Sequence, residues 1–300
     1  MKNKIIGLLA GVAFFGATAN ADIALADGLS AYGYIDLVAV DLEGDPRSGD
    51  FSEYEIGLSF SPAESQWSAV AELSYGLDDA NDTTTDFETV AVTYQHSDAL
   101  SVIFGNLYTF QGLEGPDAPS NDFISYAGFN GVDSDQSLYG ADYAEGIAVT
   151  YSVGDINLAA WSEAGSNPNK QYAASYSGIE NLTLGVAVID YNDSTDSTNI
   201  HAVYELGDFT ISVENVDTDN ALARTGALDV TSVAVAYNLG DSTIAVRSVD
   251  GDYGVTEYEK TSVAVFHSLS DNVSVGAEYS DQEFGGTETK AVAVELLYVF

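Results

Sequence analysis

The chain has 300 residues, no cysteine and a formal net charge of −39, with 47 acidic residues against 8 basic ones. This charge excludes binding to a nucleic-acid backbone, and the lack of cysteine excludes stabilising disulfides. Hydrophobic residues still make up 46% of the chain, which argues against a disordered polyanion. Acidic and apolar side chains must therefore coexist in one folded unit.

Residues 1–21 are predicted to be a signal peptide. Two lysines precede an apolar stretch at 5–15, which is too short to span a bilayer as a helix. An A-x-A cleavage sequence stands at 19–21, and Ala-Leu-Ala at 24–26 is a second possible site. A retained anchor helix is the alternative, which the length of the apolar stretch disfavours. The protein is expected to be exported, with residues 22–300 as its mature domain.

From residue 30 onward, apolar and polar residues alternate with a period of two. Every second residue from Tyr54 to Phe60 is apolar, for example, and Glu53 and Glu55 alternate with them. This period places the two sets on opposite faces of a β-strand, and no comparable stretch has the helical period of 3.6. The predicted strands, sixteen in all, are 30–41, 52–60, 67–77, 87–95, 100–107, 146–153, 156–164, 170–177, 180–191, 198–206, 208–218, 228–238, 242–249, 258–268, 271–281 and 289–300.

Tight turns recur between these strands. The sequence Tyr-x-x-Gly-Asp occurs three times, beginning at Tyr151, Tyr204 and Tyr237, and four looser versions bring the predicted hairpins to seven. Gly-Asp suits short hairpin turns, and an aromatic residue just before each turn would lie in an interfacial girdle. Longer, mostly acidic loops such as 78–86 and 190–197 lie at the opposite ends. Tight turns at one end and longer loops at the other are typical of outer-membrane barrels.

The predicted fold class is all-β, a transmembrane antiparallel up-and-down barrel of about 16 strands around a water-filled lumen. A propeller would also give a repeat, but its blades need four strands each and every unit here has two. Apolar side chains are then expected to face lipid and polar ones to face the lumen. An even number of strands places both chain ends on the tight-turn side.

The last strand ends on Phe300, with Tyr298 two positions earlier and apolar residues alternating before them. This pattern resembles the C-terminal signature of Gram-negative outer-membrane barrels, which implies that Tyr298 and Phe300 form the signal read by the barrel assembly machinery. We expect this strand to pair with the strand near 32–40, because closure leaves no free sheet edge in lipid.

The chain resembles the Gram-negative porins, notably in its first strand (27–36) and in the segment 102–119. The resemblance implies a passive diffusion channel, a homotrimer in contact with lipid and lipopolysaccharide, and a loop at 108–145 that folds inward and narrows the pore. General diffusion porins set a cluster of arginines on the barrel wall opposite this loop. Here only Arg247 is expected at a mid-strand position facing the lumen, so a strong transverse field is in doubt.

Acidic residues dominate the expected lumen. By strand parity, the lumen-facing acids are Glu53, Glu55, Glu72, Glu205, Glu214, Glu278 and Glu295. The acids of the constriction loop are Glu114, Asp117, Asp122, Asp133 and Asp135. Rings of acidic residues concentrate cations, so a cation-favouring pore is predicted. Solvated charge that only keeps the wall wet, or adaptation to a saline habitat, is the alternative.

Other functions find less support in the sequence. His96 and His267 lie beside predicted tight turns, which is the wrong end of the barrel for hydrolysis at the cell surface, and no Ser or Asp beside His201 forms a triad. The protein is therefore not predicted to be an enzyme. No cofactor is predicted. The acidic loops miss the spacing of a calcium loop, which argues against a specific site and leaves only weak Ca²⁺ or Mg²⁺ binding open. A structural or adhesive barrel, a substrate-specific channel and an exported soluble β-protein remain the other hypotheses.

Overall fold

The computed structural model describes residues 23–43, 50–78, 82–114, 121–128, 138, 143–192, 195–218 and 228–300. These residues form strands joined by turns and loops, and no helix among them is long and apolar enough to cross a membrane. The strands are β1 (Ile23–Ala26), β2 (Leu29–Leu42), β3 (Asp50–Phe60), β4 (Trp67–Asp78), β5 (Asp82–Gln95), β6 (Leu100–Leu107), β7 (Ala144–Val153), β8 (Ile156–Glu163), β9 (Lys170–Ile179), β10 (Leu182–Tyr191), β11 (Thr195–Leu206), β12 (Phe209–Thr218), β13 (Leu228–Leu239), β14 (Ser242–Tyr253), β15 (Thr256–Ser270), β16 (Val273–Phe284) and β17 (Thr287–Val299).

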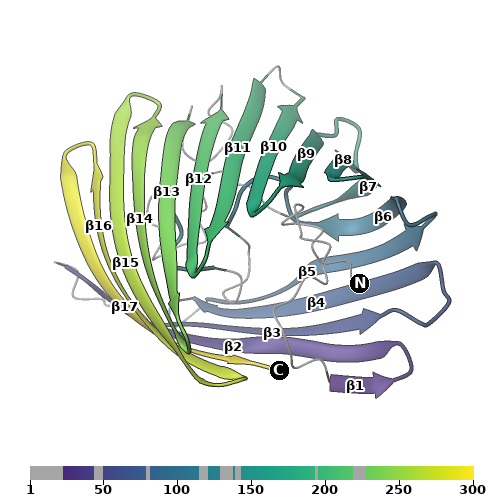
Figure 1. Cartoon of the computed structure of the whole chain (residues 1–300), viewed down its shortest axis with the longest axis horizontal. Helices are drawn as coiled ribbons and strands as arrows, with labels where there is room; N and C mark the ends of the chain where they lie inside the picture. Colours follow the sequence, from purple (N-terminus) through teal and green to yellow (C-terminus); the bar gives the residue numbers. More distant parts are fainter. Residues whose placement is uncertain are drawn as a thin grey trace.

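Strands β2 to β17 form a closed antiparallel barrel, which confirms the predicted fold class. Each strand pairs with the next, and β17 pairs back with β2, from Ala291 opposite Leu42 to Val299 opposite Tyr34. Figure 1 shows this closure as the yellow last strand lying against the purple second one. The expected pairing of the last strand with the region 32–40 is therefore confirmed.

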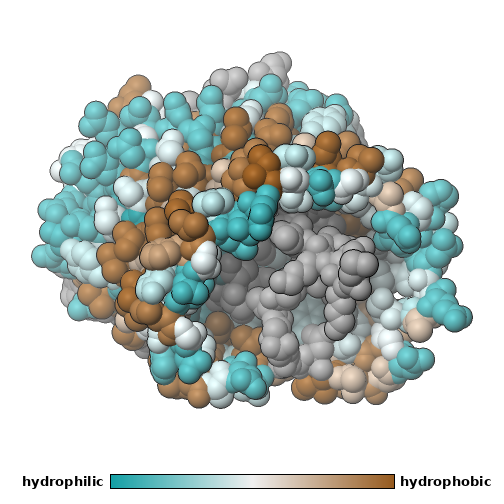
Figure 2. Space-filling view, viewed as in Figure 1, coloured by the Kyte–Doolittle hydropathy of each residue, from teal (hydrophilic) through white to brown (hydrophobic). Residues whose placement is uncertain are grey.

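The two faces of the barrel differ in the way the alternation predicts. On β17, Val294 is 50% exposed on the outer face, whereas the neighbouring Glu295 points inward and is 8% exposed. Apolar residues lie over the outer wall, where Figure 2 shows them in brown. Because exposed apolar rows on every strand would be costly in water, this outer face is suited to lipid.

The tight turns take the expected form. In the three Tyr-x-x-Gly-Asp hairpins, Gly154, Gly207 and Gly240 adopt φ angles of +60°, +63° and +65°. Glycine at the first position of a two-residue turn supplies this conformation without steric cost. Aromatic side chains pack beside the turns on the outer face, with ring centroids of Phe209 and Tyr237 4.4 Å apart. These contacts form part of the predicted girdle.

The largest differences from the sequence prediction are found at β1 and β5. Strand β1 was not expected, and it pairs with the first residues of β2 through Ile23–Ala31 and Ala24–Ser30. It forms because β17 ends opposite Tyr34, which leaves the start of β2 with an unpaired edge. Strand β5 begins at Asp82 rather than 87, which shortens the predicted loop 78–86. The predicted signal peptide, residues 1–21, lies outside the described residues.

Candidate functional site

The loop between β6 and β7 binds to the inner face of the barrel. Its described residues are 108–114, 121–128, 138 and 143. Its backbone and side chains hydrogen-bond to one inward-facing residue after another along the wall, namely Gln171 on β9, Ser197 on β11, Glu214 on β12, Arg247 on β14, Lys260 on β15 and Glu278 on β16. The loop thus crosses half of the wall, from β9 to β16.

The first part of the loop is held by side-chain acceptors and donors of the wall. The Phe110 N–H donates to Gln171 Oε1 at 2.8 Å, and Gln111 Nε2 donates to the Ser197 carbonyl at 3.1 Å. The Leu113 N–H then donates to Glu214 Oε1 at 2.9 Å. These contacts provide hydrogen-bond partners for polar groups that are buried away from water.

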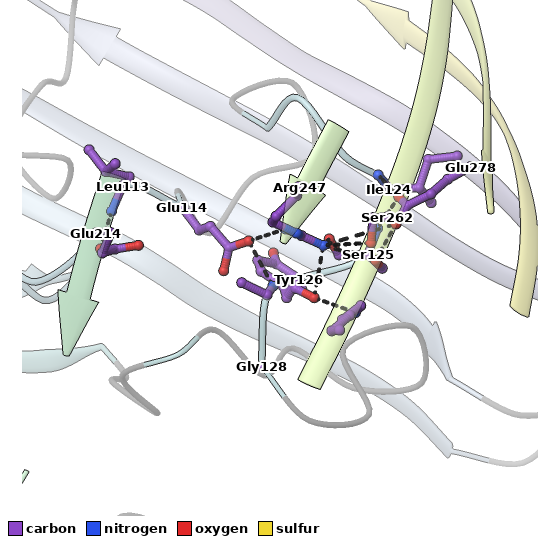
Figure 3. Close-up of polar contacts among 12 residues, drawn as sticks. Leu113, Glu114, Ile124, Ser125, Tyr126, Gly128, Glu214, Arg247, Ser262 and Glu278 are labelled. Atoms are coloured by element: carbon purple, nitrogen blue, oxygen red, sulfur yellow. Dashed lines mark hydrogen bonds and ion pairs between the residues drawn. The ribbon is translucent and has the colours of Figure 1, made fainter. Parts of the chain in front are cut away.

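Arg247 lies at the centre of the loop contacts (Figure 3). Its Nη1 donates to Glu114 Oε1 at 2.7 Å, and its Nη2 donates to the carbonyls of Ser125 at 2.7 Å and Tyr126 at 3.1 Å. The guanidinium carbon also lies 4.3 Å from the centre of the Phe123 ring, a cation–π contact. Arg247 therefore contacts two separate segments of the loop.

Glu278 and Lys260 complete this group. Glu278 accepts hydrogen bonds from the N–H groups of Ile124, at 2.7 Å, and Ser125, at 2.9 Å. Lys260 Nζ donates to the Tyr126 carbonyl at 2.6 Å. We call Glu114, Arg247, Lys260 and Glu278 the loop-docking cluster.

Besides Arg247, which the sequence predicts at a mid-strand position, a second basic residue lies on the lumen wall. Lys260 also points inward and is only 2% exposed. Strand parity explains this position: Val263 and Val265 face outward, and Lys260, an odd number of residues from both, therefore faces inward.

Glu114 is the member of the cluster that comes from the loop itself. It also accepts a hydrogen bond from the Ala127 N–H at 2.8 Å. Burial raises the pKa of the Glu114 carboxyl, and the charge of Arg247 and the Ala127 hydrogen bond partly offset that rise. The loop backbone is fixed further by Tyr258, whose hydroxyl donates to the carbonyls of Ala127 and Gly128 at 2.9 Å each.

The opposite side of the lumen is lined by acids on adjacent strands. We call these residues the carboxylate wall: Glu295 on β17, Asp36 on β2, Glu53 and Glu55 on β3, Glu72 on β4 and Glu88 on β5. Asp36 stands directly opposite Glu53 in the β2–β3 register. The sequences of β2 to β8 contain no lysine or arginine. Asp36 and Glu88 were not among the predicted lumen residues.

Aromatic hydroxyls bind two of these carboxylates. Tyr32 donates to Glu72 Oε1 at 2.5 Å, and Tyr143, at the end of the loop, donates to Glu88 Oε2 at 3.2 Å. Glu88 was missed because the β4–β5 register is irregular between Ala71 and Leu73, so a count in twos fails there.

The remaining predicted residues lie apart from these two groups. Glu205 is exposed near the tight turn that follows β11, and Asp122 is exposed on the loop. Asp117, Asp133 and Asp135 lie outside the described residues. Among the residues that are described, no group of three or more histidine or acidic side chains could hold a metal ion.

A closed barrel with an apolar outer face, a polar lumen and a loop bound inside it defines the class of outer-membrane channels. A comparison with family models agrees: the model described as Gram-negative porin matches residues 8–287. The chain belongs to the Gram-negative porin family. A comparison with curated proteins finds no match.

Solved structures share the fold at low sequence identity. A variant of the Rhodobacter blastica porin is 18% identical with a TM-score of 0.66, over 91% of this chain and 100% of that one. An anion-selective porin from Comamonas acidovorans is 14% identical with a TM-score of 0.69, over 91% of this chain and 99% of that one. At these identities the likeness establishes the fold alone.

Proposed function

We propose that this porin is a channel for passive diffusion of small hydrophilic solutes and ions, narrowed by the loop between β6 and β7, and that it favours cations. The observation that carries the preference is the carboxylate wall. Its six acids lie on five neighbouring strands, and four of these strands contain no lysine or arginine at all. Acidic side chains along a narrow passage raise the local concentration of cations and repel anions.

The other side of the lumen does not compensate for this charge. The two cations of the loop-docking cluster, Arg247 and Lys260, are matched by Glu114 and Glu278 in the same cluster. The loop-docking cluster is therefore expected to add no net positive charge that would offset the acidic surface on the other side. The anion selectivity of the Comamonas acidovorans porin is a property of that protein, with which this chain shares only the fold.

The surroundings of the channel are proposed from the family and the sequence together. Export would follow cleavage of the signal peptide after Ala21. Assembly in the outer membrane would use the Tyr298–Phe300 signal, and a homotrimer in contact with lipopolysaccharide is the expected form. Passive diffusion needs no catalytic group, and family membership favours a channel over an enzyme.

The test is to reconstitute the purified protein in planar bilayers and to measure single-channel conductance and the reversal potential in a KCl gradient. We expect stepwise conductance and a reversal potential that lies closer to the equilibrium potential of potassium than to that of chloride. Anion preference would overturn the cation proposal. The absence of conductance from protein that shows the heat-modifiable migration of a folded barrel would overturn the channel proposal and favour a structural barrel.

A further inference from the structure

The basic side chains on the lumen wall bind the loop. Among the described residues, Arg247 and Lys260 are the basic side chains buried on the inner face, at 3% and 2% exposure. Both donate to loop carbonyls, and Arg247 also pairs with the loop carboxylate Glu114. Lys170 and Lys290 lie instead near the ends of their strands and pair with acids there.

Arg247 binds two parts of the loop that are separate in the sequence. Its Nη1 binds Glu114, whereas its Nη2 binds the segment around Ser125, eleven residues later. Glu278 accepts from the N–H groups of that second segment and lies 4.0 Å from Arg247 Nη2. Figure 3 shows the guanidinium between the two segments. A planar fork of donors can make these contacts at once, and a lysine ammonium cannot reproduce their geometry.

The charges within the cluster also cancel. Two cations, Arg247 and Lys260, face two carboxylates, Glu114 and Glu278, with the Arg247 Nη1–Glu114 Oε1 distance at 2.7 Å. Because the guanidinium is buried and covered by the Phe123 ring, it offers little charge to a passing ion.

We infer that Arg247 is a positioning residue that holds the constriction loop against β14 to β16, and that it does not set the charge selectivity of the pore. This inference deepens the proposed channel function, and the conductance experiment that tests it rests on that function. The docking of the loop can be tested without any conductance measurement.

The first experiment measures loop docking by thiol accessibility. The chain has no cysteine, so single cysteines can be introduced cleanly. Ala127 is 1% exposed, and its contacts with Glu114 and Tyr258 are made by backbone atoms, which Ala127→Cys retains. The rate of modification by a cationic methanethiosulfonate is compared in the unchanged protein, in Arg247→Met and in Arg247→Lys. Ser166→Cys, on the exposed connection between β8 and β9, is the matched control.

We expect the Ala127→Cys thiol to be modified roughly tenfold faster or more in both Arg247 variants, because its accessibility follows the population of molecules with an undocked loop. The Ser166→Cys control should be modified at the same rate in all three backgrounds. Equal rates at 127 in all three backgrounds, or full protection in Arg247→Lys, would overturn the inference. Heat-modifiable migration verifies folding, and Arg247→Lys carries the test if Arg247→Met does not fold.

The second experiment separates positioning from pore charge in the same variants. If Arg247 positions the loop, both variants should show higher conductance and more open-channel noise, with cation preference unchanged or reduced. If Arg247 were a pore charge, Arg247→Met would raise cation preference and Arg247→Lys would behave like the unchanged protein, which would overturn the inference. An unchanged protein that folds and does not conduct would count against the proposed function, while the thiol rates would still decide the docking role.

Discussion

Gly33 and Phe300 close the barrel through a reciprocal pair of backbone hydrogen bonds. The Gly33 N–H donates to the Phe300 carbonyl at 2.8 Å, and the Phe300 N–H donates to the Gly33 carbonyl at 2.9 Å. A Cβ at position 33 would lie 2.2 Å from the Glu55 carbonyl oxygen and 2.8 Å from the Phe300 ring. The absence of a side chain at 33 therefore lets the last residue of the chain pack against the closing strands.

Gly33→Ala should weaken this closure. The added methyl group overpacks the site, which typically costs about 1–3 kcal/mol, and the nearest clash is with backbone, which cannot simply rotate away. The measurement is the temperature at which the folded band is lost in a heat-modifiability gel, which should fall. Ser30→Ala on the same strand is the control and should leave that temperature unchanged. Equal temperatures for Gly33→Ala and the unchanged protein would contradict the packing argument.

The two tryptophans should report opposite sides of the wall. Trp67 is 52% exposed on the outer face and packs on Tyr94, with ring centroids 4.7 Å apart. Trp161 is 2% exposed on the inner face and packs on Phe110 of the loop at 5.6 Å. In bilayers with brominated lipid, fluorescence of the Trp161→Phe protein, which retains Trp67, should be strongly quenched. The Trp67→Phe protein should be quenched much less, and the reverse order would contradict the assignment of the two faces.

Replacing Trp161 should also cost more stability than replacing Trp67. Truncating a buried aromatic side chain typically costs about 3–5 kcal/mol of folding free energy. Trp67 faces lipid on one side, so its replacement should cost less. Urea unfolding of Trp161→Ala and Trp67→Ala in the same lipid measures the difference. Similar losses for the two variants would indicate that the packing of Trp161 against Phe110 contributes little.

Strand parity predicted the faces of the barrel from the sequence. Side chains in a strand alternate strictly, so Glu53, Glu55, Glu72 and Glu295 could be placed in the lumen without coordinates. The same rule failed at Glu88, because the irregular register beside it breaks the count. Short-range periodicity therefore predicts which side chains face the lumen wherever the strands remain regular.

The loop contacts could not be predicted in this way. Arg247 and Glu114 are 133 positions apart, and the loop has no period that would place its side chains. Glu214 and Glu278 were expected to act as lumen charges, yet they are buried acceptors for loop N–H groups. Only the three-dimensional structure separates acids that bind the loop from acids that line the passage.

Strand β1 bears on where the signal peptide is removed. Cleavage after Ala26 would delete β1 and leave the first residues of β2 without their partner strand. An unpaired edge next to the closing strands is unfavourable in a barrel, so cleavage after Ala21 is expected. Intact mass and N-terminal sequencing of the purified protein should identify Asp22 as the first residue, and Ala21→Leu should retain the precursor mass. A chain that begins at Asp27 would contradict this prediction.

Neutralising one facing pair in the carboxylate wall should reduce cation preference. Asp36 and Glu53 stand directly opposite each other, and like charges in this position destabilise a sheet. A unit charge at 4 Å is worth about 1 kcal/mol in water, so the Asp36→Asn, Glu53→Gln protein should lose up to about fivefold in the potassium-to-chloride permeability ratio. Glu205→Gln, at the turn end of the lumen, should change the ratio little.

The same double variant offers a readout that does not depend on conductance. Because the repulsion between the two carboxylates is removed, the temperature of the heat-modifiable transition should rise, and the rise should shrink at high salt, where repulsion is already screened. A lower transition temperature would mean that these carboxylates make favourable contacts that outweigh their repulsion. An unchanged permeability ratio would place the selectivity of the pore elsewhere than in the carboxylate wall.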